Sequence, residues 1–343
     1  MELNGKHIAI PIFIPHKGCP FDCIYCNQKI ISGQIEEMTV PKMRSIIEEH
    51  LATIDRSSPD VQIAFYGGSF TGIPDDEQVA FLECANEYIS SGKVHSVRLS
   101  TRPDYIDDEI LSRLKKYNTK VIELGAQSMD DTVLKNSCRG HSKEAVYKAS
   151  NLIKKYGFEL GLQTMIGLPG DSEEKAINTA KEIAEINPEV VRIYPALVIK
   201  GTFMEKLYLE GKYQPLNLDS AVELCAKLMD IYEAKDINVI RVGLQPTESI
   251  NNDMDVVAGP FHPAFRQLVE SKRILTILIK KLDEYENLQG KSITIITNNS
   301  NISNVVGQKA CNLKFIKKSY GVSEIKVRDT DFSKEQNGVY IFV

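Results

Sequence analysis

Short apolar runs alternate with longer stretches of helical periodicity along the first 195 residues of the chain. Six of these runs are rich in β-branched residues and end in Gly, Pro or polar residues, which predicts buried strands. They are residues 8–14, 61–66, 96–101, 120–124, 159–165 and 189–194. Strands alternating with helices predict a parallel sheet with right-handed crossovers. We therefore expect a partial (β/α)6 barrel whose ligands bind at the rim formed by the strand ends.

The pattern is less regular beyond residue 195. It predicts a helix over residues 218–234, a candidate seventh strand over 237–242 and a mostly helical stretch over 263–288. The final residues predict a strand (292–297), a helix (303–320) and two further strands (324–328 and 338–343). We expect three parts: a partial barrel (1–245), a helical connecting segment (246–290) and a small C-terminal α/β lobe (291–343).

The composition is that of an ordinary globular protein, with 43% hydrophobic and 25% charged residues among 343. The chain has no apolar run near the ~20 residues of a membrane span and shows no signal peptide at its start. Seven cysteines are an odd number, and four of them are scattered singly (Cys84, Cys138, Cys225, Cys311). This usage predicts a reducing, cytoplasmic setting. The net charge of −5 gives no global support for nucleic-acid binding.

Cys19, Cys23 and Cys26 follow the first predicted strand with the spacing C-x3-C-x2-C. Three thiolates from one loop can each bind one iron of a [4Fe–4S] cluster and leave the fourth iron open for chemistry. A zinc site completed by His16 is the alternative, although structural zinc sites usually draw their ligands from two separated loops. Buried, inert cysteines are a third interpretation, which the surrounding Gly, Pro, Asp and Lys disfavour.

The spacing and its place after a first strand resemble the radical S-adenosylmethionine (SAM) enzymes. In that superfamily the open iron chelates SAM, and the reduced cluster cleaves it to methionine and a 5′-deoxyadenosyl radical. The resemblance implies that Cys19, Cys23 and Cys26 bind the cluster and that Tyr25 lies near the adenine. Gly67, Gly68 and Ser69 resemble the Gly-Gly-Glu strand end that holds the methionine amino group, where glycines allow close approach to the backbone. A tight turn without a ligand is the alternative there.

Within the superfamily, stretches spread over roughly residues 7–245 resemble the catalytic subunit of Elongator. They are GGSFT (67–71), TRPDY (101–105), ELGAQS (123–128), RGH (139–141), GLPG (167–170) and YPALVIKGT (194–202). Oxygen-independent coproporphyrinogen III oxidase shares three of these elements. The matches make Gln127, Arg139 and Gln163 candidate SAM contacts. Arg139 suits the SAM carboxylate because a guanidinium can donate two parallel hydrogen bonds to a carboxylate. A surface role for Arg139 and loop hydrogen bonds for the two glutamines are the alternatives.

Two departures from the relatives change what we expect. Ser100 stands where both relatives have a glutamate before the third strand end, so that cofactor contact is weakened or reassigned. Elongator's catalytic subunit carries an acetyltransferase domain, and a domain of ordinary size needs about 100–150 residues. The predicted C-terminal lobe is too short for it, and the basic N-terminal arm used on transfer RNA is missing. We therefore expect no acetyl-coenzyme A chemistry.

These observations predict a radical SAM enzyme served by an electron-donor protein, with no membrane association. An RNA base is one candidate substrate, with Lys17, Lys200 and Arg241 as candidate phosphate contacts. A small molecule, porphyrin-like or another metabolite, is the second, and a non-catalytic iron–sulfur or zinc protein is the third. His141 and Tyr194 are each equally consistent with a site role and a structural one, and the sequence does not name the substrate.

Overall fold

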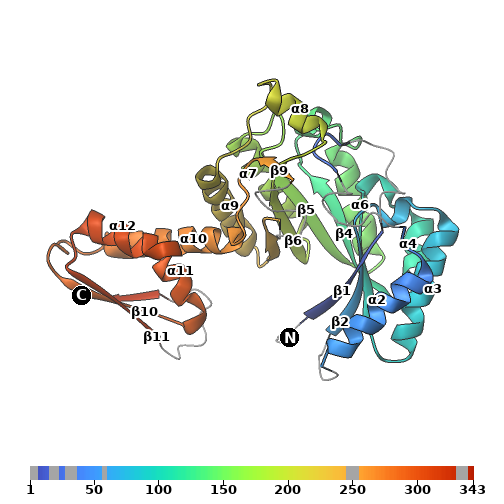
Figure 1. The fold of residues 1–343 in the computed structure, drawn as a ribbon, viewed down its shortest axis with the longest axis horizontal. Helices are drawn as coiled ribbons and strands as arrows, with labels where there is room; N and C mark the ends of the chain where they lie inside the picture. The colour runs from blue at the N-terminus through green and yellow to red at the C-terminus, as the bar shows by residue number, and fades with distance from the viewer. Residues whose placement is uncertain (1–6, 15–22, 28–36, 56–59, 245–254, 330–338) are drawn as a thin grey trace. The chain divides into compact units, whose positions relative to one another are not determined.

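The computed structural model describes residues 7–14, 23–27, 37–55, 60–244, 255–329 and 339–343. Seven parallel strands form one sheet that curls into a half-barrel (Figure 1), which confirms the predicted partial barrel and its seventh strand. In sheet order they are β1 (His7–Phe13), β2 (Asp60–Tyr66), β3 (Ser96–Thr101), β4 (Thr119–Gln127), β5 (Glu159–Ile166), β6 (Val190–Pro195) and β8 (Asn238–Val242).

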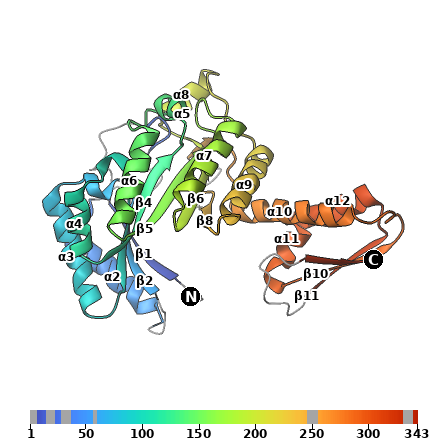
Figure 2. The same ribbon diagram turned by 180° about the vertical axis from the view of Figure 1, so that it is seen from behind.

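Helices that follow the strands cover one face of this sheet (Figure 2). They are α2 (Val40–Thr53), α3 (Asp75–Ser90), α4 (Asp108–Lys116), α6 (Lys143–Lys155) and α7 (Glu173–Ile186). The chain also forms α5 (Asp131–Asn136), α8 (Phe203–Leu209) and α9 (Leu218–Glu233). Alternate strand residues such as Ile12, Ile63 and Leu99 are fully buried, as expected for one face of each strand. The residues between them line the concave face. α5 and α8 lie near the end of the sheet where the strands finish (Figure 2).

A short antiparallel pair follows the sixth strand of the sheet. It joins β7 (Val198–Ile199) to β9 (Val256–Ala258). Two single 3-10 turns, Phe70–Gly72 and Pro103–Tyr105, follow β2 and β3 directly. Among the described residues, no helix is long and apolar enough to cross a membrane.

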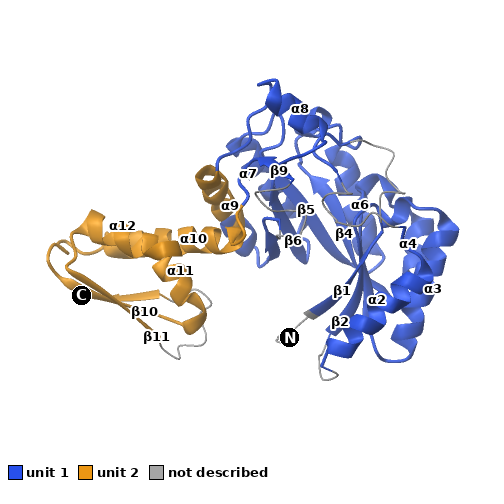
Figure 3. Cartoon of the chain, viewed as in Figure 1, with its two compact units in different colours: residues 1–217, 230–261 blue, residues 218–229, 262–343 orange. Residues whose placement is uncertain are grey.

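The chain divides into two compact units, residues 1–217 with 230–261 and residues 218–229 with 262–343 (Figure 3). The second unit has its own three-stranded sheet in the order β11-β10-β12, and its core includes Leu278, Ile293, Ile295 and Ile316. Its elements are α10 (Phe265–Leu282), β10 (Ser292–Thr297), α11 (Ile302–Val306), α12 (Cys311–Tyr320), β11 (Glu324–Asp329) and β12 (Val339–Phe342), with 3-10 turns at Asn299–Asn301 and Gln308–Ala310. The three-part division expected from the sequence stays a prediction.

One helix of this unit differs from the expectation. The single helix predicted over residues 303–320 is broken into α11 and α12 at Gly307, whose φ is +73°. A Cβ at Gly307 would lie 2.7 Å from the Sγ of Cys311, so the close approach of the two helices requires glycine there. The buried Asn312 then donates to the carbonyls of Asn304 and Ser271, which stabilises the break.

Candidate active site

The cysteine loop is anchored where the strands of the sheet end. The backbone turns between its last two cysteines, since the N–H of Cys26 donates to the carbonyl of Cys23 over 2.9 Å. Ile24, between them, is tied to two distant segments. Its N–H donates to the carbonyl of Ser137 (3.3 Å), and its carbonyl accepts from the N–H of Met204 (2.8 Å). The loop is therefore fixed by residues at the end of α5 and the start of α8.

Tyr25 lies in the same turn and packs against the apolar cluster that contains Val133, Val198 and Met204. Burial raises the pKa of its hydroxyl, while the charge of Arg139 opposes the shift, so Tyr25 stays protonated. Cys19, the remaining predicted ligand, lies outside the described residues, and so does His16 of the zinc alternative. Two of the three predicted cysteines are thus brought together in one anchored turn.

Arg139 joins the cysteine loop to the end of β4. One guanidinium nitrogen, Nη1, lies 3.6 Å from the Sγ of Cys23, and the other, Nη2, donates to the carbonyl of Gly125 over 2.8 Å. The side chain is buried, which excludes the surface role considered from the sequence. A buried guanidinium beside a thiol places a positive charge where an anionic cluster or carboxylate would be stabilised.

Arg102 holds the segment that carries Arg139, and sequence reasoning missed it as a site residue. Its Nη2 donates to the carbonyl of Arg139 over 2.7 Å. Its Nε and Nη2 also bind the two oxygens of Asp104, each at 2.9 Å. Only 1% of Arg102 is exposed. The TRPDY stretch noted in the sequence therefore acts by positioning Arg139, and an arginine fixed before a proline was the available signal.

Gln127 and Gln163 meet on the concave face. Gln163 donates from Nε2 to Oε1 of Gln127 over 3.3 Å. Gln127 has a φ of +65° and follows a shift of strand register at Gly125, which turns the end of β4. A Cβ at Gly125 would lie 2.8 Å from both Arg139 Nη2 and Gln127 Nε2, so glycine leaves room for these two side chains. The three predicted SAM contacts therefore lie near one another: Arg139 and Gln127 flank Gly125, and Gln163 binds Gln127.

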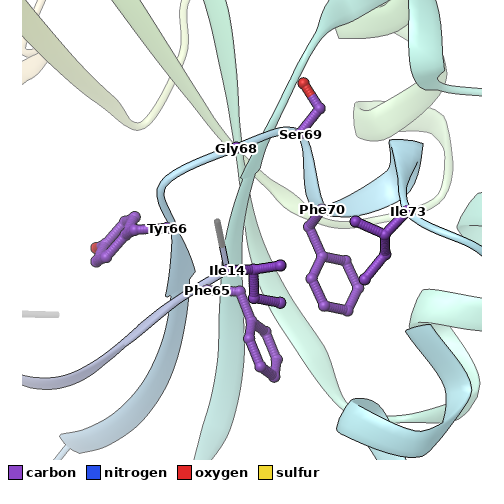
Figure 4. Close-up of a pocket in the computed structure, with 7 residues that line it drawn as sticks. All are labelled: Ile14, Phe65, Tyr66, Gly68, Ser69, Phe70 and Ile73. Atoms are coloured by element: carbon purple, nitrogen blue, oxygen red, sulfur yellow. The ribbon is translucent and has the colours of Figure 1, made fainter. Parts of the chain in front are cut away.

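The stretch from Gly67 to Ser69 forms the turn after β2. Gly67 has a φ of +101°, and a Cβ there would lie 3.0 Å from the carbonyl oxygen of Ile14, so glycine is required where this turn passes the end of β1. The segment borders a small pocket (Figure 4). Its lining includes Ile14, Phe65, Tyr66, Gly68, Ser69 and Phe70. The turn thus lies beside β1, directly before the cysteine loop.

Comparison with known proteins identifies the family of this chain. The sequence profile of the Radical SAM superfamily matches residues 13–183, and that of the Radical_SAM C-terminal domain matches residues 188–274. The chain belongs to the radical SAM superfamily. The first profile begins at the end of β1 and includes the whole cysteine loop, the Gly67 turn, Gln127, Arg139 and Gln163.

Several curated proteins are similar to this radical SAM chain. An uncharacterized protein of Methanocaldococcus jannaschii is 29% identical over 64% of the chain and 65% of its own length. The tRNA uridine(34) acetyltransferase of Methanocaldococcus infernus is 29% identical over 51% of the chain and 37% of its own length. Human Elongator complex protein 3 is 27% identical over 53% of the chain and 37% of its own length. The chain thus spans between about a third and two thirds of these relatives.

The fold is shared with solved structures of other proteins. The archaeal Methanocaldococcus infernus Elp3 superposes with a TM-score of 0.61 at 21% identity, covering 88% of this chain and 67% of that one. HydG, a maturase of the [FeFe]-hydrogenase, superposes with a TM-score of 0.53 at 15% identity, covering 78% and 55%. These likenesses concern the fold.

A buried ionic cluster on the concave face is the largest feature that sequence reasoning missed. Glu123 of β4 accepts from Arg98 of β3, with Nη2 2.6 Å from Oε1, and from Arg192 of β6. Arg192 also donates to the hydroxyl of Tyr66 over 3.1 Å. Burial opposes ionisation, yet the charges of Arg192 and Arg98 hold the pKa of Glu123 below its ordinary value. Charged residues within predicted buried strands were the available signal.

Arg241 adds a further positive charge next to this cluster. It pairs in register with Arg192 across β6 and β8, after a bulge, so the two side chains share the concave face. Its buried Nε has no hydrogen-bond partner among the described residues. Tyr194 and Met165 pair in the same way between β6 and β5 and are partly exposed. The concave face therefore combines cations with apolar and aromatic surface.

His141 is buried beside the Arg139 segment. Burial, together with the charge of Arg139, lowers its pKa to about 4, so the ring is neutral at ordinary pH. Nδ1 lies 3.2 Å from the carbonyl oxygen of Ser142, and the buried Nε2 has no hydrogen-bond partner among the described residues. His141 does not cap α6, whose N-terminal residue Ser142 makes no side-chain cap either.

Proposed function

We propose that this radical SAM enzyme modifies a uridine of tRNA. In this proposal Cys19, Cys23 and Cys26 hold a [4Fe–4S] cluster, while Gly67–Ser69, Gln127, Arg139 and Gln163 hold SAM beside Tyr25. The observation that carries the proposal is the position of Arg139 between the Sγ of Cys23 and the carbonyl of Gly125. Similarity to proteins named tRNA uridine(34) acetyltransferase supports an RNA substrate.

The described residues fit such a cofactor pair. Cys23 and Cys26 lie in one turn, and a buried guanidinium beside them suits the negative charge of thiolates and of a carboxylate. When bound, the reduced cluster supplies the electron that cleaves SAM. Arg139 orients the carboxylate, the turn at Gly67 offers backbone groups to the amino group, and Gln127 with Gln163 offers side-chain amides. Tyr25 is partly buried, with its hydroxyl oxygen enclosed, and would lie on the adenine side.

The substrate would enter the concave face. Tyr194 and Met165 supply surface on which a base can lie, and the exposed Lys200 beside the cysteine loop is a candidate phosphate contact. Asn27 of that loop donates to the backbone carbonyl of Lys200 over 3.1 Å, which joins the YPALVIKGT stretch to the cysteines. Lys17, the other candidate near the loop, lies outside the described residues.

A comparison of tRNA nucleosides by mass spectrometry, from cells with and without this protein, tests the proposal. We expect one modified uridine to disappear when the protein is absent and to return with the wild-type gene but not with Cys23→Ala. An unchanged set of tRNA nucleosides would contradict the proposal. The purified enzyme is then assayed with that tRNA, with and without acetyl-coenzyme A and with a chemical reductant or an electron-donor protein. The absence of acetyl-coenzyme A chemistry, the need for an electron-donor protein and the cytoplasmic setting stay predictions.

The cations of the concave face favour a second candidate substrate, a small anionic molecule. Arg98 and Arg192 bind one carboxylate, Glu123, and Arg241 lies beside Arg192, so this part of the face carries excess positive charge. A carboxylate or phosphate of a metabolite would complement it. This candidate predicts that an RNA-free metabolite fraction stimulates SAM cleavage. Stimulation by tRNA alone would exclude it.

A further inference from the structure

The sheet of the second unit buries one face and opens the other. Within β10, Ile293 and Ile295 are completely buried, whereas Thr294 and Ile296, between and after them, are partly exposed. On the flanking strands, Ile325, Val327 and Ile341 pack against the core of this unit. Because strand side chains alternate between faces, the residues between these positions point to the other side. Figure 1 shows α10 and α12 on one side of β10 and β11.

Strand register arranges the open face into two rows. Tyr340, Ile296 and Arg328 form one row across the three strands, and Phe342, Thr294 and Lys326 form the next. We call these six residues the open sheet face. Tyr340 is 38% and Phe342 57% exposed, and both basic residues are exposed. Each row thus presents an aromatic ring on one edge strand and a cation on the other, about 10 Å apart because neighbouring strands lie about 4.8 Å apart.

Other charges near this face leave it positive. The Nζ of Lys281 lies 5.7 Å from the ring centre of Tyr340 and adds a third cation. Lys326 lies 3.2 Å from Glu324, but an exposed pair of this kind is weak and is readily exchanged for another anion. A phosphate can therefore approach both edges of the face.

The C-terminal part of this unit, residues 262–343, has a net positive charge in a chain that is acidic overall. Residues 262–343 contain 13 Lys and Arg against 8 Asp and Glu, a net charge of +5. Residues 1–261 contain 28 against 38, a net charge of −10. The acidic total of the whole chain therefore hides a basic lobe, and such an asymmetry is typical of nucleic-acid binding. The matched family profiles end at residue 274, before the open sheet face.

We propose that the open sheet face binds a single-stranded segment of RNA, with bases stacked on Tyr340 and Phe342 and phosphates held by Lys326 and Arg328. Exposed aromatic residues interleaved with cations on a sheet are the physical requirements of single-strand recognition, since every base has a face that can stack. A protein interface of the same kind would be depleted in lysine at its centre. The inference rests on the proposed function for RNA as the substrate.

Fluorescence anisotropy of the full chain with a labelled 12-nucleotide oligouridine tests it. Phe342→Ala and Tyr340→Ala are each expected to weaken RNA affinity by about 5- to 100-fold, the range for losing one stacked base. The double variant Lys326→Gln, Arg328→Gln is expected to lower the slope of log affinity against log salt by about 0.7 for each lost phosphate contact. Circular dichroism checks that each variant is folded. If Phe342→Ala and Tyr340→Ala unfold, the salt dependence of the Lys326→Gln, Arg328→Gln variant tests the proposal.

Matched controls come from α12 of the same unit. Phe315→Ala removes a ring that is 44% exposed, and Lys317→Gln with Lys318→Gln removes two exposed charges. We expect both controls to bind like the wild type. Equal binding by the controls and the open-face variants would overturn the inference and leave the proposed function standing. The same conclusion would follow if tRNA stimulated SAM cleavage by a wild-type chain that binds no single-stranded RNA. A shift in sedimentation with Phe342→Ala, at unchanged RNA affinity, would instead identify a protein interface.

Discussion

Arg139 places its Nη1 3.6 Å from the Sγ of Cys23, although 116 residues separate the two in the chain. The same guanidinium donates to the carbonyl of Gly125, and the carbonyl of Arg139 accepts from the buried Arg102. One side chain therefore links the cysteine loop after β1 to the end of β4, and a second arginine fixes its position.

Replacing Arg139 tests that link. Arg139→Gln is expected to weaken SAM binding by about 10- to 100-fold, because hydrogen bonds to charged groups contribute about 1.5–3 kcal/mol. Arg139→Lys keeps the positive charge but loses the planar guanidinium that can bind a carboxylate with two hydrogen bonds. Its affinity for SAM should therefore lie between those of the wild type and Arg139→Gln. The KM for SAM and the rate of 5′-deoxyadenosine formation measure the effect. Arg44→Gln, which removes an exposed guanidinium paired with Glu87, is the control. Wild-type KM values in Arg139→Gln would show that Arg139 does not contact SAM.

Gly125 is expected to be intolerant of even a methyl group. In Gly125→Ala the new Cβ would lie 2.8 Å from both Arg139 Nη2 and Gln127 Nε2. Displacing these side chains should reduce SAM cleavage at least 10-fold, while overpacking costs about 1–3 kcal/mol of stability. The control is Gly211→Ala, which meets nothing within 4 Å but has a φ of +69°. It should cost about 1–2 kcal/mol of stability and leave the KM unchanged; equal losses of activity in both would refute the steric explanation.

The sequence predicted the sheet well because its strands are apolar runs with regular spacing, each closed by Gly, Pro or a polar residue. It also predicted Arg139, Gln127 and Gln163 through motif resemblance, and the structure brings these three together around Gly125. Their binding of SAM stays a prediction. The broken helix at Gly307 was missed because helical periodicity continues across it, whereas the backbone at Gly307, Lys309 and Ala310 has positive φ.

The charged residues of the ionic cluster are visible in the sequence, but which of them meet could not be predicted. Arg98, Glu123 and Arg192 are separated by 25 and 69 residues, and each lies within a strand of the sheet. Local periodicity contains no information on which charges meet across a curled sheet. Only the parallel register places the three side chains on one face.

Removing the central carboxylate should destabilise the fold. Glu123→Gln leaves Arg98 and Arg192 buried without their counter-charge, and breaking a buried pair in this way costs about 3–5 kcal/mol. The free energy of unfolding in urea, followed by circular dichroism, gives the cost. Glu87→Gln breaks an exposed pair with Arg44 and should cost about 0–1 kcal/mol. Similar costs for the two variants would show that the cluster is not a stabilising unit.

His141 predicts a pH dependence of stability. Its pKa is lowered to about 4 in the folded chain, whereas an unfolded histidine titrates near ~6.5. The unfolded chain therefore binds a proton that the folded chain does not, and this contribution to stability is lost as the pH falls from about 6.5 to about 4. The loss reaches at most about 3 kcal/mol. Urea unfolding at pH 7 and pH 4.5 should show a smaller difference in His141→Asn than in the wild type; an equal difference would contradict the assignment.

Anaerobic reconstitution of the purified chain with iron and sulfide, followed by reduction and addition of SAM, tests the proposed site most directly. We predict four irons per chain, formation of 5′-deoxyadenosine that tRNA stimulates, and loss of this product in Cys23→Ala with the fold retained. Zinc in place of iron, or no 5′-deoxyadenosine from the fully reconstituted and reduced wild type, would contradict a cluster-bearing, SAM-cleaving site at the cysteine loop.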